Sequence, residues 1–470
     1  MLFSSVTFLF LFLPIVLLIN PLLPGKYQNA FLFLVSLLFY SWAGPHFVLF
    51  LLGSIAFNWL WGLILTLATS ARSRALWVGF GVGVNLAPLV YFRYALFGSD
   101  IQNLLMNSLP PPVFRVSALV APLGISFFTF HAISYLVDIK RGRALPFRSP
   151  LELGLYFAFF PQLIAGPIIR YHQIAGQIRG GRDSGHANSR IRFTQGLAKK
   201  LLIADPLAAP VSHVFDLPPA SLNTGAAWFG IICYTIQIYF DFSGYSDMAI
   251  GLAGMLGFTF PENFAAPYSA RSMRDFWRRW HITLSTWFRD YLYIPLGGNR
   301  GSYTRVALNL ILIFVLCGLW HGAALPFLFW GLYHGLFLAL ERGRWGRALE
   351  KLPEALARAG TLLIVVFGWV LFRSSSLDRA AEFWKAMLGF GSPSSYAGGI
   401  QLYHSFQIHL SLGIGIALVA NEWLPAHAQK NRFEILQSGK AGLAWMMGLL
   451  VVSSMYASAN SSHPFLYFQF

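Results

Sequence analysis

The sequence has few charged residues and few cysteines for its length. Of its 470 residues, 11% are Asp, Glu, Lys or Arg, whereas a soluble globular protein has about 25%. This low share, together with 56% hydrophobic residues, excludes a soluble enzyme and a disordered protein. The two cysteines, Cys233 and Cys317, lie inside apolar segments, so we expect no disulfide framework.

Acidic residues are especially scarce, because 18 Asp and Glu stand against 34 Lys and Arg and leave a net charge of +16. The basic residues lie in short segments between apolar runs. In such places they set the orientation of a membrane protein and contact anionic lipid. We therefore expect the lipid bilayer as a partner, and no nucleic acid.

Long apolar runs make up most of the chain. A helix that crosses a bilayer needs about 20 apolar residues, and runs that do not alternate every second residue argue against a membrane β-barrel. The predicted fold class is an all-α polytopic membrane protein, with residues 1–470 in a single membrane domain, because no repeat or long linker is visible. Twelve spans are expected, at residues 5–23, 27–43, 47–69, 75–96, 116–137, 195–217, 226–258, 304–320, 323–341, 361–372, 402–420 and 441–457.

The run at 151–169 is ambiguous, and the basic residues decide how it is interpreted. If it crossed the membrane, the arginines of residues 170–193 would lie outside, whereas basic loops tend to stay in the cytoplasm. Because Pro161 and Pro167 interrupt the run, we predict a re-entrant segment that returns to the cytoplasmic side. Both chain termini are then predicted to lie outside.

The 226–258 segment is long and carries polar residues at membrane depth. As a straight helix its 33 residues would extend about 50 Å, against a hydrocarbon core of about 30 Å. We therefore expect it to tilt, bend or break, around Ser243–Gly244. Its polar side chains either line a wet cavity or hold helices together through hydrogen bonds. They are Gln237, Asp241, Ser243, Tyr245, Ser246 and Asp247.

The 271–290 segment mixes arginines with aromatic residues at helical spacing. An apolar stripe beside basic residues predicts an amphipathic helix at the membrane interface, with its tryptophans at headgroup depth. The arginines either anchor this helix or bind a phosphorylated cytosolic donor such as coenzyme A, because guanidinium pairs well with phosphate. The stripe consists of Trp277, Trp280, Leu284 and Trp287, and the arginines are Arg274, Arg278 and Arg279.

Two histidines in the later apolar runs are possible catalysts. His321 is bracketed by Gly318 and Gly322, which let backbone or a substrate approach closely. Imidazole suits general base catalysis near neutral pH, but His334 has the same chemistry, and either residue could instead be structural. The residues alone leave these interpretations open. No metal site is expected, because the chain has no HExxH motif.

Six short motifs follow one another over nearly the whole chain. They are Pro122-Leu-Gly-Ile-Ser-Phe-Phe-Thr-Phe-His131, Phe160-Pro-Gln-Leu-Ile-Ala-Gly-Pro167, Tyr239-Phe-Asp-Phe-Ser-Gly-Tyr-Ser-Asp247, Phe276-Trp-Arg-Arg-Trp-His-Ile-Thr-Leu-Ser285, Trp320-His-Gly322 and Pro464-Phe-Leu-Tyr-Phe468. Together and in this order, they resemble the membrane-bound O-acyltransferase superfamily, in particular its branch of bacterial alginate-type polysaccharide O-acetyltransferases.

The resemblance implies a ring of helices around a central funnel, with an essential histidine deep inside it. Trp320-His-Gly322 matches the family motif, so the resemblance favours His321 over His334 and His131 as the catalytic residue. Many members carry an asparagine upstream as a second polar residue, where this chain has Asp290, 31 residues before His321. The expected donor and acceptor channel residues are Trp320, Gly322, Asp241, Ser243, Tyr245, Asp247, Arg278, Arg279, His281 and His334.

The implied reaction moves an acetyl group from cytoplasmic acetyl-CoA across the bacterial inner membrane, for O-acetylation of a secreted exopolysaccharide. His321 would act as general base or form an acetyl-histidine intermediate. Acetyl-CoA is expected as a substrate, with no bound cofactor. Members of the branch work beside periplasmic SGNH-hydrolase-like partners, so the acceptor is either the polymer or a serine of the partner. Alginate and cellulose are both open as the polymer, and both termini of this chain would be periplasmic.

Two functions of other classes remain as alternatives, a transporter or exporter and a non-catalytic scaffold of a polysaccharide secretion complex. The twelve expected spans and a discontinuous 226–258 helix would suit a transporter. Secondary transporters, however, pair broken helices in two repeated halves, and only one such helix and no repeat are visible in the sequence.

Overall fold

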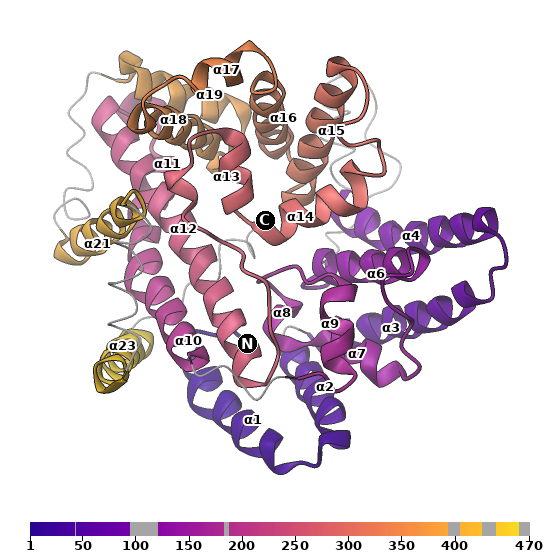
Figure 1. Cartoon of the computed structure of the whole chain (residues 1–470). Coiled ribbons are helices and arrows are strands. Elements are labelled where there is room, and N and C mark those ends of the chain that lie inside the picture. The colour runs from indigo at the N-terminus through magenta and orange to yellow at the C-terminus, as the bar shows by residue number, and fades with distance from the viewer. Residues whose placement is uncertain (43, 95–120, 183–187, 393–404, 425–438, 460–470) are drawn as a thin grey trace, which may run out of the picture. The chain divides into compact units, whose positions relative to one another are not determined.

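The computed structural model describes residues 1–42, 44–94, 121–182, 188–392, 405–424 and 439–459, and every regular element in these ranges is a helix (Figure 1). The all-α class is thus confirmed for this part of the chain. The Pro464–Phe468 motif and the start of the 116–137 run lie outside the described residues.

The chain divides into two compact units. The first consists of Met1–Arg190 with Ala249–Pro261, and the second of Ile191–Met248 with Glu262–Phe470. Each unit is described by itself below.

The first unit is a set of apolar helices packed around phenylalanine rings. Within it α7 packs against both α2 and α3, while α4 packs against α6. The Phe160 ring lies 5.4 Å from that of Phe12 and 5.7 Å from that of Phe39. The elements are η1 (Phe8–Phe12), α1 (Leu13–Ile19), η2 (Asn20–Leu22), α2 (Gly25–Ser41), α3 (Pro45–Thr66), α4 (Ala71–Tyr94), α6 (Ile125–Lys140), α7 (Pro150–Ala158), α8 (Phe160–Leu163) and α9 (Tyr171–Ile178).

The predicted interruption of the 151–169 run is confirmed. Helix α7 ends at Ala158, Phe159 has extended backbone angles (φ −52°, ψ 112°), and the short α8 then carries Pro161 in its first turn. The freed backbone is held by side chains, since the Ser36 hydroxyl accepts a hydrogen bond from the Phe160 amide at 3.1 Å. Whether this broken segment re-enters on the cytoplasmic side stays a prediction.

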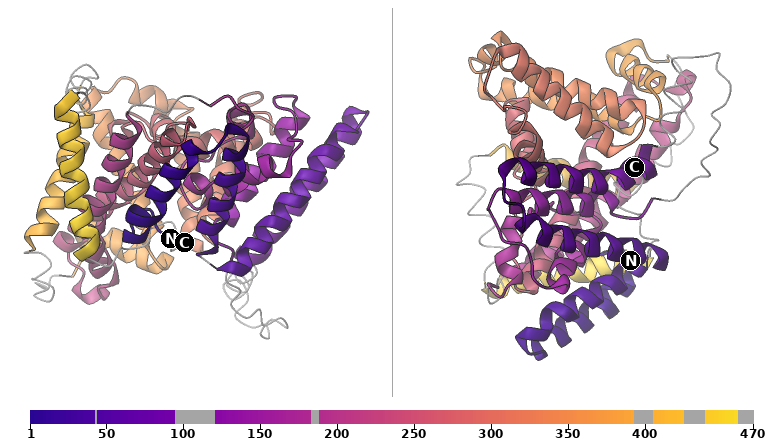
Figure 2. Two further views of the ribbon diagram at one scale, coloured as in Figure 1. Left: turned by 90° about the horizontal axis from the view of Figure 1, so that it is seen from below. Right: turned by 90° about the vertical axis from the view of Figure 1, so that its right-hand side faces the viewer.

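The second unit contains the remaining helices, and α10 and α12 extend across its boundary. Two of them, α15 and α16, form an antiparallel hairpin that is visible from two sides (Figures 1 and 2). The elements are α10 (Ser189–Ala198), η3 (Lys199–Ala204), η4 (Asp205–Leu207), α11 (Ala208–Asp216), η5 (Pro219–Ser221), α12 (Thr224–Met255), η6 (Pro267–Ser269), α13 (Met273–Arg279), α14 (Ile282–Phe288), η7 (Arg289–Tyr293), α15 (Tyr303–His321), α16 (Leu325–Leu340), α17 (Arg344–Leu349), α18 (Glu354–Arg373), α19 (Leu377–Lys385), η8 (Ala386–Phe390), α21 (Phe406–Glu422) and α23 (Gly439–Ala459).

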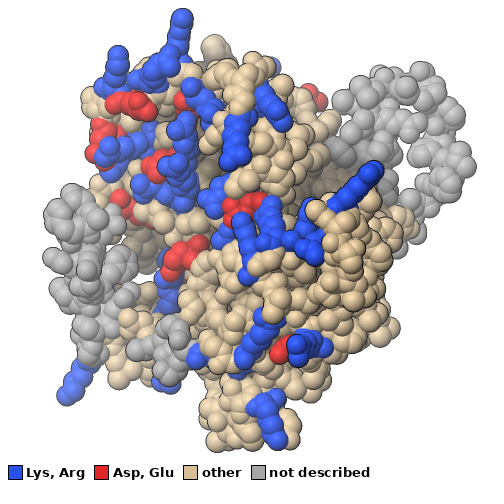
Figure 3. Space-filling view, turned by 45° about the vertical axis from the view of Figure 1, so that its right-hand side comes forward, with Lys and Arg blue, Asp and Glu red and all other residues tan. Residues whose placement is uncertain are grey.

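Five of the described helices are long and apolar enough to cross a membrane: α3, α4, α15, α18 and the Gly442–Ala459 part of α23. Two shorter apolar stretches, Phe8–Leu22 and Leu325–Leu340, coincide with further predicted spans. In Figure 3 most of the visible surface carries no charged side chain, and Lys and Arg gather in patches. These features confirm a multi-pass membrane protein, while the number of twelve crossings stays a prediction.

We expected the 226–258 segment to tilt, bend or break; it does not break, and whether it tilts or bends stays a prediction. Helix α12 runs uninterrupted from Thr224 to Met255 and passes through Ser243–Gly244. Gly244 serves a close crossing instead, because a Cβ atom built on it would lie 2.7 Å from the carbonyl oxygen of Gly196 in α10. A missing side chain thus permits helix contact here rather than a break. Of the two features that would suit a transporter, the discontinuous helix is therefore absent from this segment.

Candidate active site

The α15–α16 hairpin is packed so closely that it requires glycine at its contact positions. A Cβ atom on Gly318 would lie 2.1 Å from the Phe327 carbonyl oxygen, and one on Gly331 would lie 2.2 Å from the Phe314 carbonyl oxygen. A Cβ atom on Gly322 would meet the Phe327 ring at 2.3 Å. The glycines on either side of His321 therefore admit the neighbouring helix, and their open faces are already filled.

His321 is the last residue of α15, and its side chain is buried among aromatic rings. Its imidazole centroid lies 4.7 Å from the adjacent Trp320 ring, 5.2 Å from that of Trp330 and 5.1 Å from that of Phe372. Gly322 follows with an extended backbone (φ −168°), which ends the helix directly after the histidine. The Trp-His-Gly motif therefore places a buried imidazole at the turn of the hairpin.

His334 lies on α16 and also contacts Trp330, with ring centroids 4.8 Å apart. The indole N–H of Trp277 donates a hydrogen bond to His334 Nδ1 at 3.3 Å. Because an indole N–H can only donate, Nδ1 must be the unprotonated nitrogen, and the proton of the neutral ring sits on Nε2. His334 is thus an acceptor that fixes Trp277.

A cavity of about 300 Å³ opens beside this hairpin. Four arginines surround it, and its remaining wall is largely apolar and includes Trp277, Phe314 and Cys317. Cys317 precedes His321 by four residues, so the two side chains share one face of α15. The cavity is lined by Arg274, Trp277, Arg278, Leu284, Ser285, Phe288, Arg289, Tyr293, Asn299, Leu310, Ile313, Phe314, Cys317, Leu338 and Arg342.

The predicted arginines separate into two groups. Arg274 and Arg278 line the cavity, whereas Arg279 forms an ion pair with Asp275 at 2.8 Å and donates a hydrogen bond to the Ser269 hydroxyl at 3.2 Å. Arg279 thus ties α13 to η6 and is not among the residues that line the cavity.

Sequence reasoning missed two residues with several hydrogen bonds in this region, Asn299 in the cavity wall and Glu341 next to the start of α13. Asn299 Oδ1 accepts hydrogen bonds from Tyr293 at 2.7 Å and from Arg342 at 2.8 Å. The Glu341 carboxylate accepts the backbone N–H groups of Met273 and Arg274 at the start of α13. An acid directly after the apolar α16 run was the available signal for Glu341, whereas no sequence pattern links it to α13.

The prediction of one amphipathic helix at 271–290 is wrong in its shape, while a location at the membrane interface stays a prediction. Two short helices, α13 and α14, are separated at His281, whose backbone is left-handed (φ 43°). The four residues of the apolar stripe are all buried inside the protein, and Trp280 packs against Phe276 and Trp369. Because the chain turns at His281, the stripe residues pack inside the protein instead of forming an exposed apolar face.

Asn263 stabilises this turn. Its side-chain oxygen lies 3.1 Å from His281 Nδ1 and accepts hydrogen bonds from the Thr283 amide and hydroxyl at 3.2 and 2.8 Å. Burial lowers the pKa of His281 to about 3, so this imidazole is neutral at physiological pH. His281 therefore lies as a neutral ring at the corner between α13 and α14, and its role as a channel residue stays a prediction.

The acidic residues of α12 hold helices together. Asp247 pairs with Arg192 at 2.7 Å and with Lys199 at 2.6 Å, and Lys200 pairs with Asp205 and Asp241 at 2.6 Å each. These contacts agree with the second interpretation of the 226–258 polar residues. Ser243 and Tyr245 are also buried, and no described contact assigns either of them to a channel.

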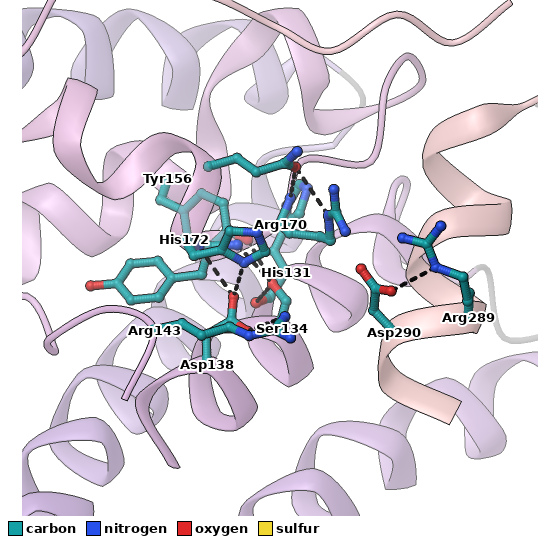
Figure 4. A network of polar contacts seen from close by, with 11 residues as sticks. His131, Ser134, Asp138, Arg143, Tyr156, Arg170, His172, Arg289 and Asp290 are labelled. Carbon is teal, nitrogen blue, oxygen red and sulfur yellow. Dashed lines mark hydrogen bonds and ion pairs between the residues drawn. The ribbon is translucent and has the colours of Figure 1, made fainter. Parts of the chain in front are cut away.

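Asp290 lies in a single-turn π-helix, η7, and forms an ion pair with Arg289 at 2.8 Å (Figure 4). π-helical turns are rare and occur frequently at functional sites. Arg289 lines the cavity and Asp290 is not among the lining residues, so the ion pair with Arg289 links the carboxylate to the cavity wall. Its role as a second catalytic residue stays a prediction.

The third histidine, His131, belongs to the first unit, where it packs on Tyr156 with ring centroids 5.0 Å apart (Figure 4). Neither ring nitrogen has a hydrogen-bond partner among the described residues. Nearby, His172 Nδ1 lies 2.7 Å from the Asp138 carboxylate, and the Ser134 hydroxyl lies 2.8 Å from the Tyr156 hydroxyl. These contacts, which sequence reasoning missed, join α6 to α7 through Tyr156 and to α9 through His172.

Comparison with known proteins agrees with the motif resemblance. Residues 53–352 match the membrane-bound O-acyltransferase family, MBOAT. The chain is 39% identical to the probable alginate O-acetylase AlgI of Pseudomonas aeruginosa over the full length of both proteins. It is 45% identical to the protein of the same name from Azotobacter vinelandii, over 83% of this chain and 79% of the relative.

A further relative is the peptidoglycan O-acetyltransferase of Helicobacter pylori, with 36% identity over 84% of this chain and 81% of that protein. The family match covers more than half of the chain, and relatives of this similarity span it from end to end. The chain is therefore an acyltransferase that belongs to the membrane-bound O-acyltransferase family.

Proposed function

We propose that the protein transfers an acetyl group from cytoplasmic acetyl-CoA, across the bacterial inner membrane, to hydroxyl groups of a secreted polysaccharide of the alginate type. The observation that carries this proposal is the arginine-lined cavity beside the helix that ends in His321. The names of the relatives, which include alginate O-acetylases and a peptidoglycan O-acetyltransferase, support a polymer acceptor and favour alginate over cellulose.

The cavity suits the two chemical halves of coenzyme A. Arg274, Arg278 and Arg342 offer guanidinium groups to phosphates, which they bind through paired hydrogen bonds. The apolar wall suits an uncharged thioester arm that continues inward past Cys317. Such an arm would deliver the thioester along the face of α15 that also carries His321.

His321 is the proposed general base. It takes the proton from the acceptor hydroxyl while the oxygen attacks the thioester carbonyl, and the carbon–sulfur bond then breaks to release coenzyme A. The departing thiolate recovers the proton, so the reaction is balanced. An acetyl-histidine intermediate would need the same residue as nucleophile.

The acceptor at the outer side is proposed to be the polymer itself or a serine of a periplasmic SGNH-hydrolase-like partner. With both termini in the periplasm, the arginines around the cavity would face the cytoplasm, where acetyl-CoA is made. Asp290 is proposed as the second polar residue of the site.

The test is acetyl transfer by the purified full-length protein in liposomes. Radiolabelled acetyl-CoA is supplied with alginate and with a periplasmic SGNH-hydrolase-like protein, and wild type is compared with His321→Ala. We expect label in polymer or partner for wild type, and a loss of about 10²- to 10⁴-fold for the variant, the usual contribution of a general base.

The matched control is His334→Asn, because the asparagine oxygen can replace Nδ1 as the acceptor for Trp277. It should keep at least about a tenth of the activity, since only one neutral hydrogen bond is altered. Wild-type activity in His321→Ala, or equal loss in both variants, would contradict the assignment of the base.

A further inference from the structure

Three aromatic rings form a collar around His321: Trp320, Trp330 and Phe372. Each meets the imidazole nearly edge-on, with interplanar angles of 71°, 88° and 75° respectively. Centroid distances near 5 Å in this geometry correspond to direct van der Waals contact. Only 4% of the His321 surface is exposed, so little space is left beside the imidazole.

The side of His321 that faces α16 offers no additional space. The Phe327 backbone and ring occupy the positions that side chains at Gly318 and Gly322 would take. Phe327 also packs edge-on against Phe372, with centroids 5.1 Å apart. An acyl chain next to His321 therefore cannot extend along the glycine face of the hairpin.

Two of the collar rings contact each other and one further ring, that of Trp369. Trp330 and Phe372 lie 5.1 Å apart, and Trp369 contacts both, at 6.4 Å from Trp330 and 5.7 Å from Phe372. Trp369 is completely buried. A close-packed interior deforms little. Trp330 and Phe372 therefore cannot change their side-chain conformation without displacing each other or Trp369.

Building on the proposed function, we propose that Phe372 and Trp330 determine the length of the acyl group, so that an acetyl group fits beside His321 and longer chains are excluded. Hydrophobic enclosure of this kind discriminates between acyl groups through contact of the rings with each added methylene. Phe372 is the better residue to alter, because it comes from α18, outside the α15–α16 hairpin.

The experiment measures transfer from acetyl-, propionyl-, butyryl- and hexanoyl-CoA by the full-length protein in liposomes, with the same acceptor throughout. Wild type should prefer acetyl over butyryl in kcat/KM. In Phe372→Ala the ratio of butyryl to acetyl transfer should rise about tenfold or more, the effect expected for opening a hydrophobic pocket by this amount.

Two further variants keep the result interpretable. Phe383→Ala removes a ring of the same size from another buried position of the same unit, where it stacks on Phe215, and should leave the ratio unchanged. Phe372→Leu is a smaller change, for use if the alanine variant does not fold. It should raise the ratio of propionyl to acetyl transfer.

An unchanged ratio in folded Phe372→Ala and Phe372→Leu, or a wild type without preference for acetyl, would overturn the proposal while leaving the acyltransferase function intact. An equal shift in Phe383→Ala would also overturn it, because the effect would then reflect general loosening. No transfer from any acyl-CoA by folded wild type would instead overturn the proposed donor, and the length proposal with it.

Discussion

Two charged regions of the second unit use their side chains in opposite ways. Where α10 and η3 meet α12, carboxylates and cations are matched, as in the pairs of Asp247 with Arg192 and Lys199. Around the cavity, Arg274, Arg278 and Arg342 form no ion pair within the described residues, and the wall beside them is apolar. Matched charges join helices, whereas converging charges of one sign create a positive potential that suits an anionic ligand.

The largest expected effect is a loss of stability where paired charges join α12 to its neighbours. Lys200→Met leaves Asp205 and Asp241 together without their shared cation, and removing one partner of a buried pair costs about 3–5 kcal/mol. Thermal unfolding of the detergent-purified protein should show this loss. Lys199→Met is the control, because Asp247 keeps Arg192 and the cost should be about 1 kcal/mol. Equal losses in both variants would refute the importance of the buried triad.

The next effect is on substrate binding by the arginines that line the cavity. Arg278→Ala should raise the KM for acetyl-CoA about tenfold with little change in kcat, because one charge-assisted hydrogen bond to phosphate is worth about 1.5–3 kcal/mol at most. Arg279→Ala, whose guanidinium pairs with Asp275, should leave KM nearly unchanged. If the two variants raised KM equally, the cavity would not be the donor site.

A smaller effect is expected at His281, which carries no charge at neutral pH. Burial lowers its pKa from 6.5 to about 3. Between these pH values the unfolded chain binds a proton at His281 that the folded chain does not bind, so the free energy of unfolding is unaffected above pH 6.5 and decreases as the pH falls toward 3. We expect the melting temperature of wild type to fall from pH 7 to pH 4 by roughly 5 °C more than that of His281→Gln.

The control for this titration is His46→Gln, because His46 is exposed. The melting temperature of the His46→Gln variant should change with pH as that of wild type does. Parallel profiles for wild type and His281→Gln would show that the buried imidazole does not titrate with unfolding.

The sequence predicted much of the helix framework because long apolar runs have few alternatives to helices in a bilayer. The predicted 304–320 and 323–341 runs correspond closely to α15 and α16. Length alone could not decide between a tilt, a bend and a break of 226–258, where Gly244 lies in a continuous helix and permits a close crossing. The prediction of one helix failed for 271–290, where periodicity could not reveal a turn held by Asn263.

The candidate site, too, was predicted from the sequence only in part. Only the family motif favoured His321 over His334, because local pattern left both open, and two of the three arginines selected from the 271–290 segment line the cavity. Pattern could not separate Arg278 from Arg279, because the difference depends on Asp275 and Ser269 as partners. Glu341 was missed because its partners, the first amides of α13, lie more than sixty residues earlier.

By itself the sequence determined the membrane class, the positions of its main apolar helices and the acyltransferase family, since these follow from local composition and short motifs. Only the tertiary structure decided which charges are paired, which arginines surround a cavity and which rings enclose His321. These properties arise when helices distant in the sequence pack together, and a side chain's partners are then set by the fold around it.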